Sequence, residues 1–398
     1  AYNDENGNFK PLPFNFSRGS SATVVNKLGL IETVQANDAR VDYLNNAKGA
    51  LLIEPQRSNY LPNSDNGSNY TVFSATKTLN EVISLDGTLN SFTLEGNGEY
   101  NQVLGESVSI TLPSAGDYTF SVFAKKGTNN FIQLFFNQFT GSSNGEAYFD
   151  LENGTTSSSF GKIEKYGNDW YKCSVVGTVV GSDLSGKFGF RISYTSSNFF
   201  FPTANDAIGK NAYFYGFQVE KGSYATSYIP TQGTVQTRLA DSCYQGGLLN
   251  IGVLNNTALT LFFNSTLTSD TTNQFLDIIA LYHPTVGKEI RIASRIDNIL
   301  YVQQGGIVNS GDDFNSLNLG SNSINFKKIA IVLTQTQFKV FADGSQIGST
   351  QNGSYNVNFD SLSFRRFNGA VQTKIQNKEI KLYNTALSDS ELTALTTI

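Results

Sequence analysis

Three consecutive phenylalanines, Phe199, Phe200 and Phe201, stand in the otherwise polar stretch TSSNFFFPTAND. Aromatic rings stack on the apolar C–H faces of sugars, while Asn, Gln, Asp and Arg side chains bond the hydroxyl groups. Successive side chains of a strand point to opposite faces, so this run turns at least one ring away from a core. It predicts either a glycan-binding surface or rings buried in the core or at a subunit contact. Burial is favoured because exposed apolar patches are normally covered.

Five further residues are candidates for the same chemistry. Trp170 starts the run WYKCSVV on the face opposite the apolar side chains, so it packs at a strand end, under a loop or against a neighbouring chain, or it offers its ring to a sugar. Tyr282 and His283 stand before a proline in LYHPTVG, which favours a surface turn. Arg365 and Arg366 lie between aromatic residues in FRRFNG, where they bind an acidic sugar or solvate a strand edge.

Enzyme chemistry finds little support in these residue types. A Ser-His-Asp triad would have to use the single histidine, His283, around which no catalytic motif stands. A glycosidase needs only two carboxylates, and Asp150 and Glu152 share a strand face in FDLENG. With 33 acidic residues in the chain, such pairs arise by chance. We therefore predict no catalytic residue and keep a polysaccharide-cleaving enzyme as the alternative.

Candidate metal ligands can be named from residue type alone. Asp206, Asp312 and Asp313 suit calcium because the ion prefers carboxylate oxygens in loops, but no EF-hand-like string surrounds them. Solvated loop acids are the simpler interpretation. Zinc is disfavoured because one histidine and two distant cysteines, Cys173 and Cys243, do not make a ligand set. We expect no cofactor beyond, at most, a structural calcium ion.

The composition predicts strands joined by tight turns. Charged residues make up 15% of the 398 residues, and Asn, Ser, Thr and Gly fill the deficit beside 30 Phe and 19 Tyr. Aromatic, Thr-rich chains with many glycines are typical of β-sheets. The formal net charge is −5 and Lys and Arg are not clustered, which disfavours a nucleic-acid partner. No apolar run is long enough for a membrane helix, so membrane insertion is not expected.

Hydrophobic alternation divides the chain into three parts. Residues 1–60 hold three short strand-like runs, too few to bury a core alone, so this segment must dock against another domain or another chain. Residues 61–241 and 242–398 each repeat strand-like runs between turn residues, and Ser388 with Glu391 forms a helix-capping box near the end. The pattern predicts an all-β chain of tandem antiparallel β-sandwiches behind a small N-terminal β docking segment.

The polar stretch YATSYIPTQGTVQTRLAD, residues 224–241, separates the two expected sandwiches. Its alternating Thr, Gln and Val predict an extended connector that forms the last strand of the first sandwich and then crosses over. Pro230 would interrupt strand pairing at the crossing because proline lacks the backbone donor.

Four groups of segments in residues 16–241 resemble those of bacteriophage tail-fibre and spike proteins, in the same order. They are FSRGSSATVVNKLGLIETVQANDARVDY with GALLIEPQRSNYLPNS, YTFSVFAKKG, AYFDLENGT with YGNDWYKCSV, and FYGFQVEKGSYATSYIPTQGTVQTRLAD. Residues 242–398, which include IKLYNTALSDSELTALTT, resemble a concanavalin A-like, laminin-G-like sandwich. The Glu-x-Asp-x-x-Glu string of concanavalin-type glycosidases is missing from these residues.

This resemblance implies a virion surface protein, a tail fibre or spike that attaches the particle to host-surface polysaccharide. Residues 61–241 would be a jelly roll similar to carbohydrate-binding modules, and the chain would form a homotrimer. Residues 1–60 would dock onto other virion proteins or onto a neighbouring copy. A depolymerase on a tail spike and a secreted bacterial carbohydrate-binding adhesin are the alternatives, and the lack of a signal-like opening counts against the adhesin.

Overall fold

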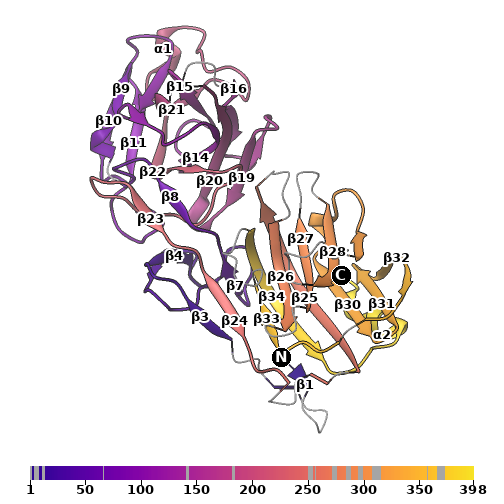
Figure 1. The fold of residues 1–398 in the computed structure, drawn as a ribbon. Coiled ribbons are helices and arrows are strands. Elements are labelled where there is room, and N and C mark those ends of the chain that lie inside the picture. Colours follow the sequence, from indigo (N-terminus) through magenta and orange to yellow (C-terminus); the bar gives the residue numbers. More distant parts are fainter. Residues whose placement is uncertain are drawn as a thin grey trace.

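The computed structural model shows two β-sandwiches placed end to end, with short N-terminal strands between them (Figure 1). The structure describes residues 2–3, 9–10, 14–65, 67–139, 143–181, 184–249, 254–255, 257–270, 276–283, 288–294, 299–306, 315–355, 357–364 and 373–398. The predicted fold class, tandem antiparallel sandwiches, is confirmed over these ranges. None of the helices in them is long and apolar enough to span a membrane.

The first sandwich is a jelly-roll type of domain made of two packed sheets. One sheet runs in the order β10 (Ala75–Leu79), β11 (Phe92–Gly96), β22 (Asn211–Lys221), β14 (Gly116–Lys126), β20 (Trp170–Val179) and β16 (Ser143–Asn144), and β19 (Gly161–Lys165) also pairs with β20. The facing sheet runs β18 (Thr155–Thr156), β17 (Glu146–Asp150), β15 (Phe131–Asn137), β21 (Ser185–Ser193), β12 (Val103–Glu106) and β9 (Thr71–Phe73), and β13 (Ile110–Thr111) also pairs with β21.

Aromatic side chains fill the space between these two sheets. Phe120 of β14 lies 5.3 Å from Phe188 of β21, centroid to centroid, and Phe92 lies 5.8 Å from Phe190. The alternation in YTFSVFAKK correctly places Phe120 in this core. The opposite face of strand β14 is buried as well, because Phe123 packs in a separate apolar cluster that includes residues of the N-terminal segment and the connector.

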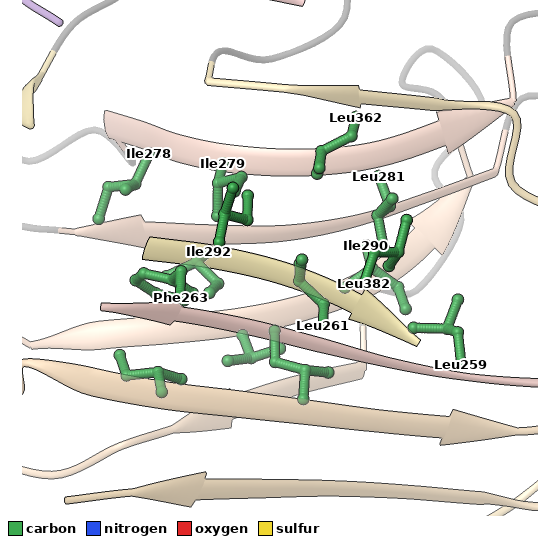
Figure 2. Close-up of a cluster of buried hydrophobic side chains, with 14 of the residues drawn as sticks. Leu259, Leu261, Phe263, Ile278, Ile279, Leu281, Ile290, Ile292, Leu362 and Leu382 are labelled. Atoms are coloured by element: carbon green, nitrogen blue, oxygen red, sulfur yellow. The ribbon is translucent and has the colours of Figure 1, made fainter. Parts of the chain in front are cut away.

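The second sandwich recruits strands from both ends of the chain. One sheet runs β32 (Ser345–Asn352), β31 (Gln337–Ala342), β30 (Lys328–Thr334), β25 (Ala258–Ser269), β34 (Thr373–Tyr383), β1 (Tyr2–Asn3) and β2 (Phe9–Lys10), while β7 (Ala50–Ile53) pairs with β34 and β6 (Val41–Asp42). The other runs β29 (Asn315–Asn318), β28 (Leu300–Gly306), β27 (Lys288–Ser294), β26 (Leu276–His283), β33 (Ser361–Ser363), β24 (Ser242–Gln245) and β3 (Asn15–Ser17). Figure 2 shows aliphatic side chains of both sheets, such as Leu261 and Leu281, in the core between them.

Helix α2 (Asp389–Thr396) covers the outer face of the second sandwich. The predicted capping box is confirmed: the Ser388 hydroxyl accepts from the backbone N–H of Glu391, and the Glu391 carboxylate accepts from that of Ser388. Leu392 is fully buried in a cluster with Phe262 and Phe341. The remaining short elements are η1 (Gly67–Asn69), η2 (Gly167–Asp169), α1 (Ala204–Ala207) and η3 (Ser323–Asn325).

The N-terminal segment lies against both sandwiches of its own chain. Strands β3 and β7 pair with β24 and β34 of the second sandwich. The hairpin of β4 (Ala22–Val25) and β5 (Ile31–Val34) places Ile31 against Trp170 and Phe123 on the outer side of the first sandwich. Too small to enclose a core, the segment is stabilised by burying its apolar side chains against the two larger domains.

The connector differs from the prediction. Residues 236–238 form β23 (Gln236–Arg238), which pairs with β8 (Arg57–Asn59) of the N-terminal segment and does not extend the first sandwich. The preceding strand β22 pairs with β14 over most of its length, but with β11 over Asn211, Ala212, Tyr213 and Phe214 only. Beyond Phe214 that edge is bonded by residues 60–64, because the backbone N–H of Phe217 donates to the carbonyl oxygen of Ser64 at 2.9 Å. Tyr224 and Tyr228, in the chain leaving β22, are buried instead of solvated.

A cluster of buried ions, here called the seam cluster, joins the connector to the N-terminal segment. It consists of Arg18, Arg40, Glu54, Arg238 and Asp241. Arg40 Nη1 lies 2.8 Å from Glu54 Oε2, and Arg238 Nη1 lies 2.9 Å from the same oxygen. Because an unpaired charge in such surroundings is costly, the cluster can form only when all of these segments are in place.

Candidate functional site

The predicted phenylalanines divide between the core and one outer face of the first sandwich. Phe201 is 2% exposed and belongs to the core, so it is not accessible to a ligand. Phe200 is 44% exposed and Phe199 is half-buried. These two rings lie over the outer side of the sheet containing β15, β21, β12 and β9, which we call the open face.

Arg191 of β21 lies between two phenyl rings on the open face. Its Cζ atom is 4.0 Å from the ring centroid of Phe135 and 4.0 Å from that of Phe199. Phe199 and Phe200 follow with ring centroids 4.2 Å apart and 36° between their planes. The four side chains form one continuous stack, the Arg191 stack, that ends in the exposed ring of Phe200. Cation–π contacts hold the planar guanidinium and thereby fix both neighbouring rings.

The sheet register explains why this stack forms. Strands β15 and β21 pair Gln133 with Arg191 and Phe135 with Gly189. A Cβ atom at Gly189 would lie 2.1 Å from Phe135 Cζ, so the absence of a side chain there makes room for the ring. Phe135 therefore lies flat over β21, at the height where Arg191 can stack on it.

A second pair of aromatic rings lies on the same face. Arg191 pairs across the strands with Leu104, and Leu104 pairs with Phe73, so the three side chains point to one side. Neighbouring strands are about 4.8 Å apart, which places Phe73 about 10 Å from Arg191 along the sheet. Phe73 and Tyr100 are 42% and 50% exposed, and their rings stack at 5.0 Å with 21° between planes.

Polar side chains surround the two aromatic positions. Arg191 Nη1 donates to Gln133 Oε1 at 3.1 Å, and Gln133 Nε2 donates to Glu146 Oε2 at 3.3 Å. On the same face, Lys187 Nζ of β21 lies 3.3 Å from Glu106 Oε2 of β12. Positive and negative groups alternate here, so the face carries donors and acceptors without a strong field of either sign.

Arg191 is charged and Tyr148 is neutral on the open face at neutral pH. Burial lowers the pKa of Arg191, although Tyr148 and Glu106 act in the opposite direction, and an arginine stays charged at neutral pH. Burial and the neighbouring Glu146 raise the pKa of the Tyr148 hydroxyl, which stays neutral and able to donate or accept. Exposed rings beside such groups match the two kinds of surface on a sugar, its apolar C–H face and its hydroxyls.

Two other predicted aromatic residues are not available to a ligand. Trp170 is fully buried, in the cluster between the first sandwich and the N-terminal hairpin, because β5 and the connector cover the face that the sequence pattern left open. This corrects its candidacy for sugar binding. Tyr282 is 6% exposed and lies 6.3 Å from Tyr244, ring to ring, which also corrects its candidacy.

Several predicted residues lie outside what the structure describes. Arg365, Arg366, Asp312 and Asp313 fall outside the described ranges. His283 was expected in a turn, but its backbone ends strand β26 and pairs with Lys288. The side chain of His283 is not among those described.

The remaining acidic candidates have structural partners. Asp206 caps helix α1, where its carboxylate accepts from the backbone and hydroxyl of Thr203. Asp150 holds a turn by accepting from the backbone of Glu152, whose own carboxylate pairs with Lys126. In the described part of the chain, no three His, Cys, Asp or Glu side chains are grouped as a metal site.

Reasoning from the sequence missed Arg191, Phe73 and Tyr100. One signal for Arg191 was present: in KFGFRISY it falls on the opposite face from the two core phenylalanines of the run. Nothing local could indicate Phe135 as its partner, because 56 residues separate them and the contact depends on the pairing of β15 with β21. Tyr100 stands in a loop, and only the fold brings it over Phe73.

Comparisons with known proteins give partial structural likenesses. No family model and no curated protein matches the chain. A structure of botulinum neurotoxin type C, whose cell entry depends on interaction with two ganglioside molecules, shares 14% identity over 39% of each chain with a TM-score of 0.30. The CBM40 of Ruminococcus gnavus IT-sialidase shares 16% identity over 36% of this chain and 83% of that one, with a TM-score of 0.23.

A SAP-like pentraxin from Limulus polyphemus is a third partial likeness, with 11% identity over 36% of this chain and 73% of that one and a TM-score of 0.26. The chain spans about two fifths of the length of the neurotoxin structure. These likenesses are too remote to bear on activity, which has to be argued from the residues themselves.

Proposed function

We propose that this protein binds glycans without cleaving them, through the open face of its first sandwich. The observation that carries the proposal is the Arg191 stack, which supports the exposed ring of Phe200 from one side, beside hydrogen-bonding side chains. A ring that already packs against a neighbour loses less conformational entropy when a sugar stacks on its free side.

The two aromatic positions define the size of the ligand. Phe73 and the Arg191 stack are separated by two strand spacings, about 10 Å. An oligosaccharide that stacked on both would run across the strands and lie over Leu104. The partly exposed side chains of Glu106 and Lys187 would then be within reach of its hydroxyl groups.

We further propose that the protein is a fibre or spike on the surface of a bacteriophage particle and attaches it to host polysaccharide. The support is the resemblance of residues 16–241 to such proteins. A homotrimer would present three open faces, and linked sites of modest affinity gain strength through their effective concentration. The N-terminal segment would contact other virion proteins with the surface it leaves exposed.

Binding to a printed glycan array tests the site. We expect the intact chain to bind a defined set of oligosaccharides, and Phe200→Ala to weaken that binding by about fivefold to tenfold through loss of a stacking ring. Phe160→Ala is the matched control, since Phe160 is 43% exposed but lies beside β20, on the other sheet. Equal loss in both variants, or no loss in either, would show that the open face is not the site.

Two measurements separate the alternatives. A reducing-end assay on host capsular polysaccharide should show no new ends after incubation, whereas a depolymerase would release them. Light scattering of the purified chain should give the mass of three copies, and a stable monomer would argue against the fibre or spike assignment.

A further inference from the structure

Two neighbouring pockets lie on either side of the connector, away from the open face. The first, of about 400 Å³, lies between the hairpin β4–β5 and the connector. The second, of about 550 Å³, lies between η1, the end of β10 and the connector. Gln232 lines both of them, so one side chain separates the two pockets. Both volumes fall within the range of about 300–1,000 Å³ typical of small-molecule sites.

The first pocket combines hydroxyl and amide groups with an apolar wall. Thr33, Gln236 and Thr237 are exposed and supply the polar side chains, and Ile229 with Pro230 supplies the apolar ones. The wall is held in place by a hydrogen bond from Thr23 Oγ1 to the carbonyl oxygen of the neighbouring Tyr228, at 2.6 Å. A pyranose ring needs both kinds of surface, as at the open face.

The one charged side chain among the residues lining the first pocket is already neutralised. Arg238 is 1% exposed and pairs with Glu54 at 2.9 Å, and its second Nη donates to the carbonyl oxygen of Pro55. An anionic ligand would therefore gain little here, because the cation that could attract it is paired inside the protein.

The second pocket is lined mainly by side-chain amides. Asn63, Asn80 and Asn90 line it together with Asp65, whose carboxylate lies 3.5 Å from Gln232 Nε2. Asn90 Nδ2 donates to Asp86, but its buried Oδ1 has no hydrogen-bond partner among the residues that the structure describes. Because this oxygen is buried, a ligand in the pocket would meet the side-chain amides of Asn63, Asn80 and Gln232 instead.

We infer that the two pockets form a second binding site, for a neutral oligosaccharide that passes over Gln232 from one pocket to the other. The site shares no residue with the open face, so the two proposals can be tested independently. A peptide strand is a poorer fit than a sugar, because β23, the strand beside the first pocket, offers an edge of three residues. The N-terminal hairpin thereby contributes to binding as well as to the fold.

Isothermal titration calorimetry with the full chain tests this site through Gln232→Ala. The variant keeps the backbone bridge to Asn63 and removes one exposed side chain with a weak 3.5 Å contact. Gln337→Ala is the matched control, because Gln337 is exposed on the second sandwich and its amide makes one 3.4 Å contact. The probes are maltohexaose, cellohexaose and mannohexaose, each beside its disaccharide.

We expect at least one hexasaccharide to bind more tightly than its disaccharide, because it fills both pockets. Gln232→Ala should weaken that hexasaccharide about fivefold, as expected for the loss of a hydrogen bond, while Gln337→Ala stays within twofold of the parent. Phe200→Ala should leave this Gln232-dependent binding in place. A hexasaccharide that loses affinity in Phe200→Ala and not in Gln232→Ala would support the open face alone and overturn the second site.

Two further results would also overturn the inference. One is the absence of binding by all three hexasaccharides at millimolar concentration. The other is Gln232-dependent binding of an alternating Thr-Val decapeptide without binding of any sugar, which would make the pockets a peptide site. Retention of the parent melting temperature by Gln232→Ala shows that a loss of binding is local.

Discussion

Arg18 and Asp241 form a fully buried ion pair, with 3.0 Å between Nη1 and Oδ1, although 223 residues separate them in the sequence. Asp241 also pairs with Arg40, and its Oδ2 accepts from the backbone N–H of Glu54 at 2.8 Å. One carboxylate thus binds three parts of the N-terminal segment at the point where the second sandwich begins. We expect the segment and the two sandwiches to lose structure together when this group is removed.

Replacing Asp241 should destabilise the whole chain. Asp241→Ala leaves Arg18 facing an apolar side chain inside the protein, and breaking a buried pair in this way costs about 3–5 kcal/mol in the free energy of unfolding. Thermal denaturation followed by circular dichroism measures the loss. Asp389→Ala is the control, since Asp389 pairs with Lys339 but is 60% exposed, and such pairs contribute at most about 1 kcal/mol. Similar shifts in both variants would contradict this role of the seam cluster.

The seam cluster should also make the protein sensitive to acid. Burial opposes ionisation of Glu54, but Arg238, Arg40 and Lys374 outweigh it and hold the pKa of this carboxyl well below its ordinary value. An unfolded glutamate has a pKa of about 4.3. The stabilisation from Glu54 is therefore fully present above about pH 4.3 and is lost as the pH falls towards the folded pKa.

Melting temperatures recorded from pH 7 to pH 2 test this dependence. They should fall on the acid side for the parent chain, and Glu54→Gln should be less stable at pH 7 and show a flatter acid limb. A variant whose acid limb parallels that of the parent would assign the pH dependence to other carboxylates.

Arg191 should resist conservative replacement. A lysine at this position keeps the charge but lacks the planar group that lies 4.0 Å from both phenyl rings. Arg191→Lys should therefore weaken glycan binding nearly as much as Arg191→Ala, by about fivefold. Full rescue by lysine on the glycan array would mean that charge, and not the stack, supports binding.

The two cysteines should be unreactive in the folded protein. Cys173 is fully buried and Cys243 is 1% exposed. Burial raises the pKa of the Cys173 thiol well above its ordinary value, and burial with the nearby Asp241 raises that of Cys243 to about 12. Because the thiolate is the reactive form, a thiol reagent at pH 8 should label neither until denaturant is added, and then both. Labelling of Cys243 before unfolding would indicate that the seam opens locally.

Local patterns in the sequence were reliable wherever one face of a strand meets a core. The alternation in YTFSVFAKK places Phe120 correctly, and the spacing of Ser388 and Glu391 identifies the cap of α2. The same reasoning left Trp170 with an open face, because the elements that cover it come from β5 and the connector. Periodicity states which side chains share a face, but it carries no information about a distant segment that lies on that face.

Local sequence patterns were enough to predict antiparallel β-sandwiches in tandem, since strand alternation and turn residues are properties of neighbouring positions. The pairing of β23 with the N-terminal segment required the tertiary structure, because β8 is far away in the sequence and residues 60–64 already bond the exit end of β22. The tertiary structure alone placed Phe135 beside Arg191 and the connector beside the β4–β5 hairpin. These contacts depend on strand register and on burial between segments that are far apart in the chain, and neither is encoded in any one stretch of residues.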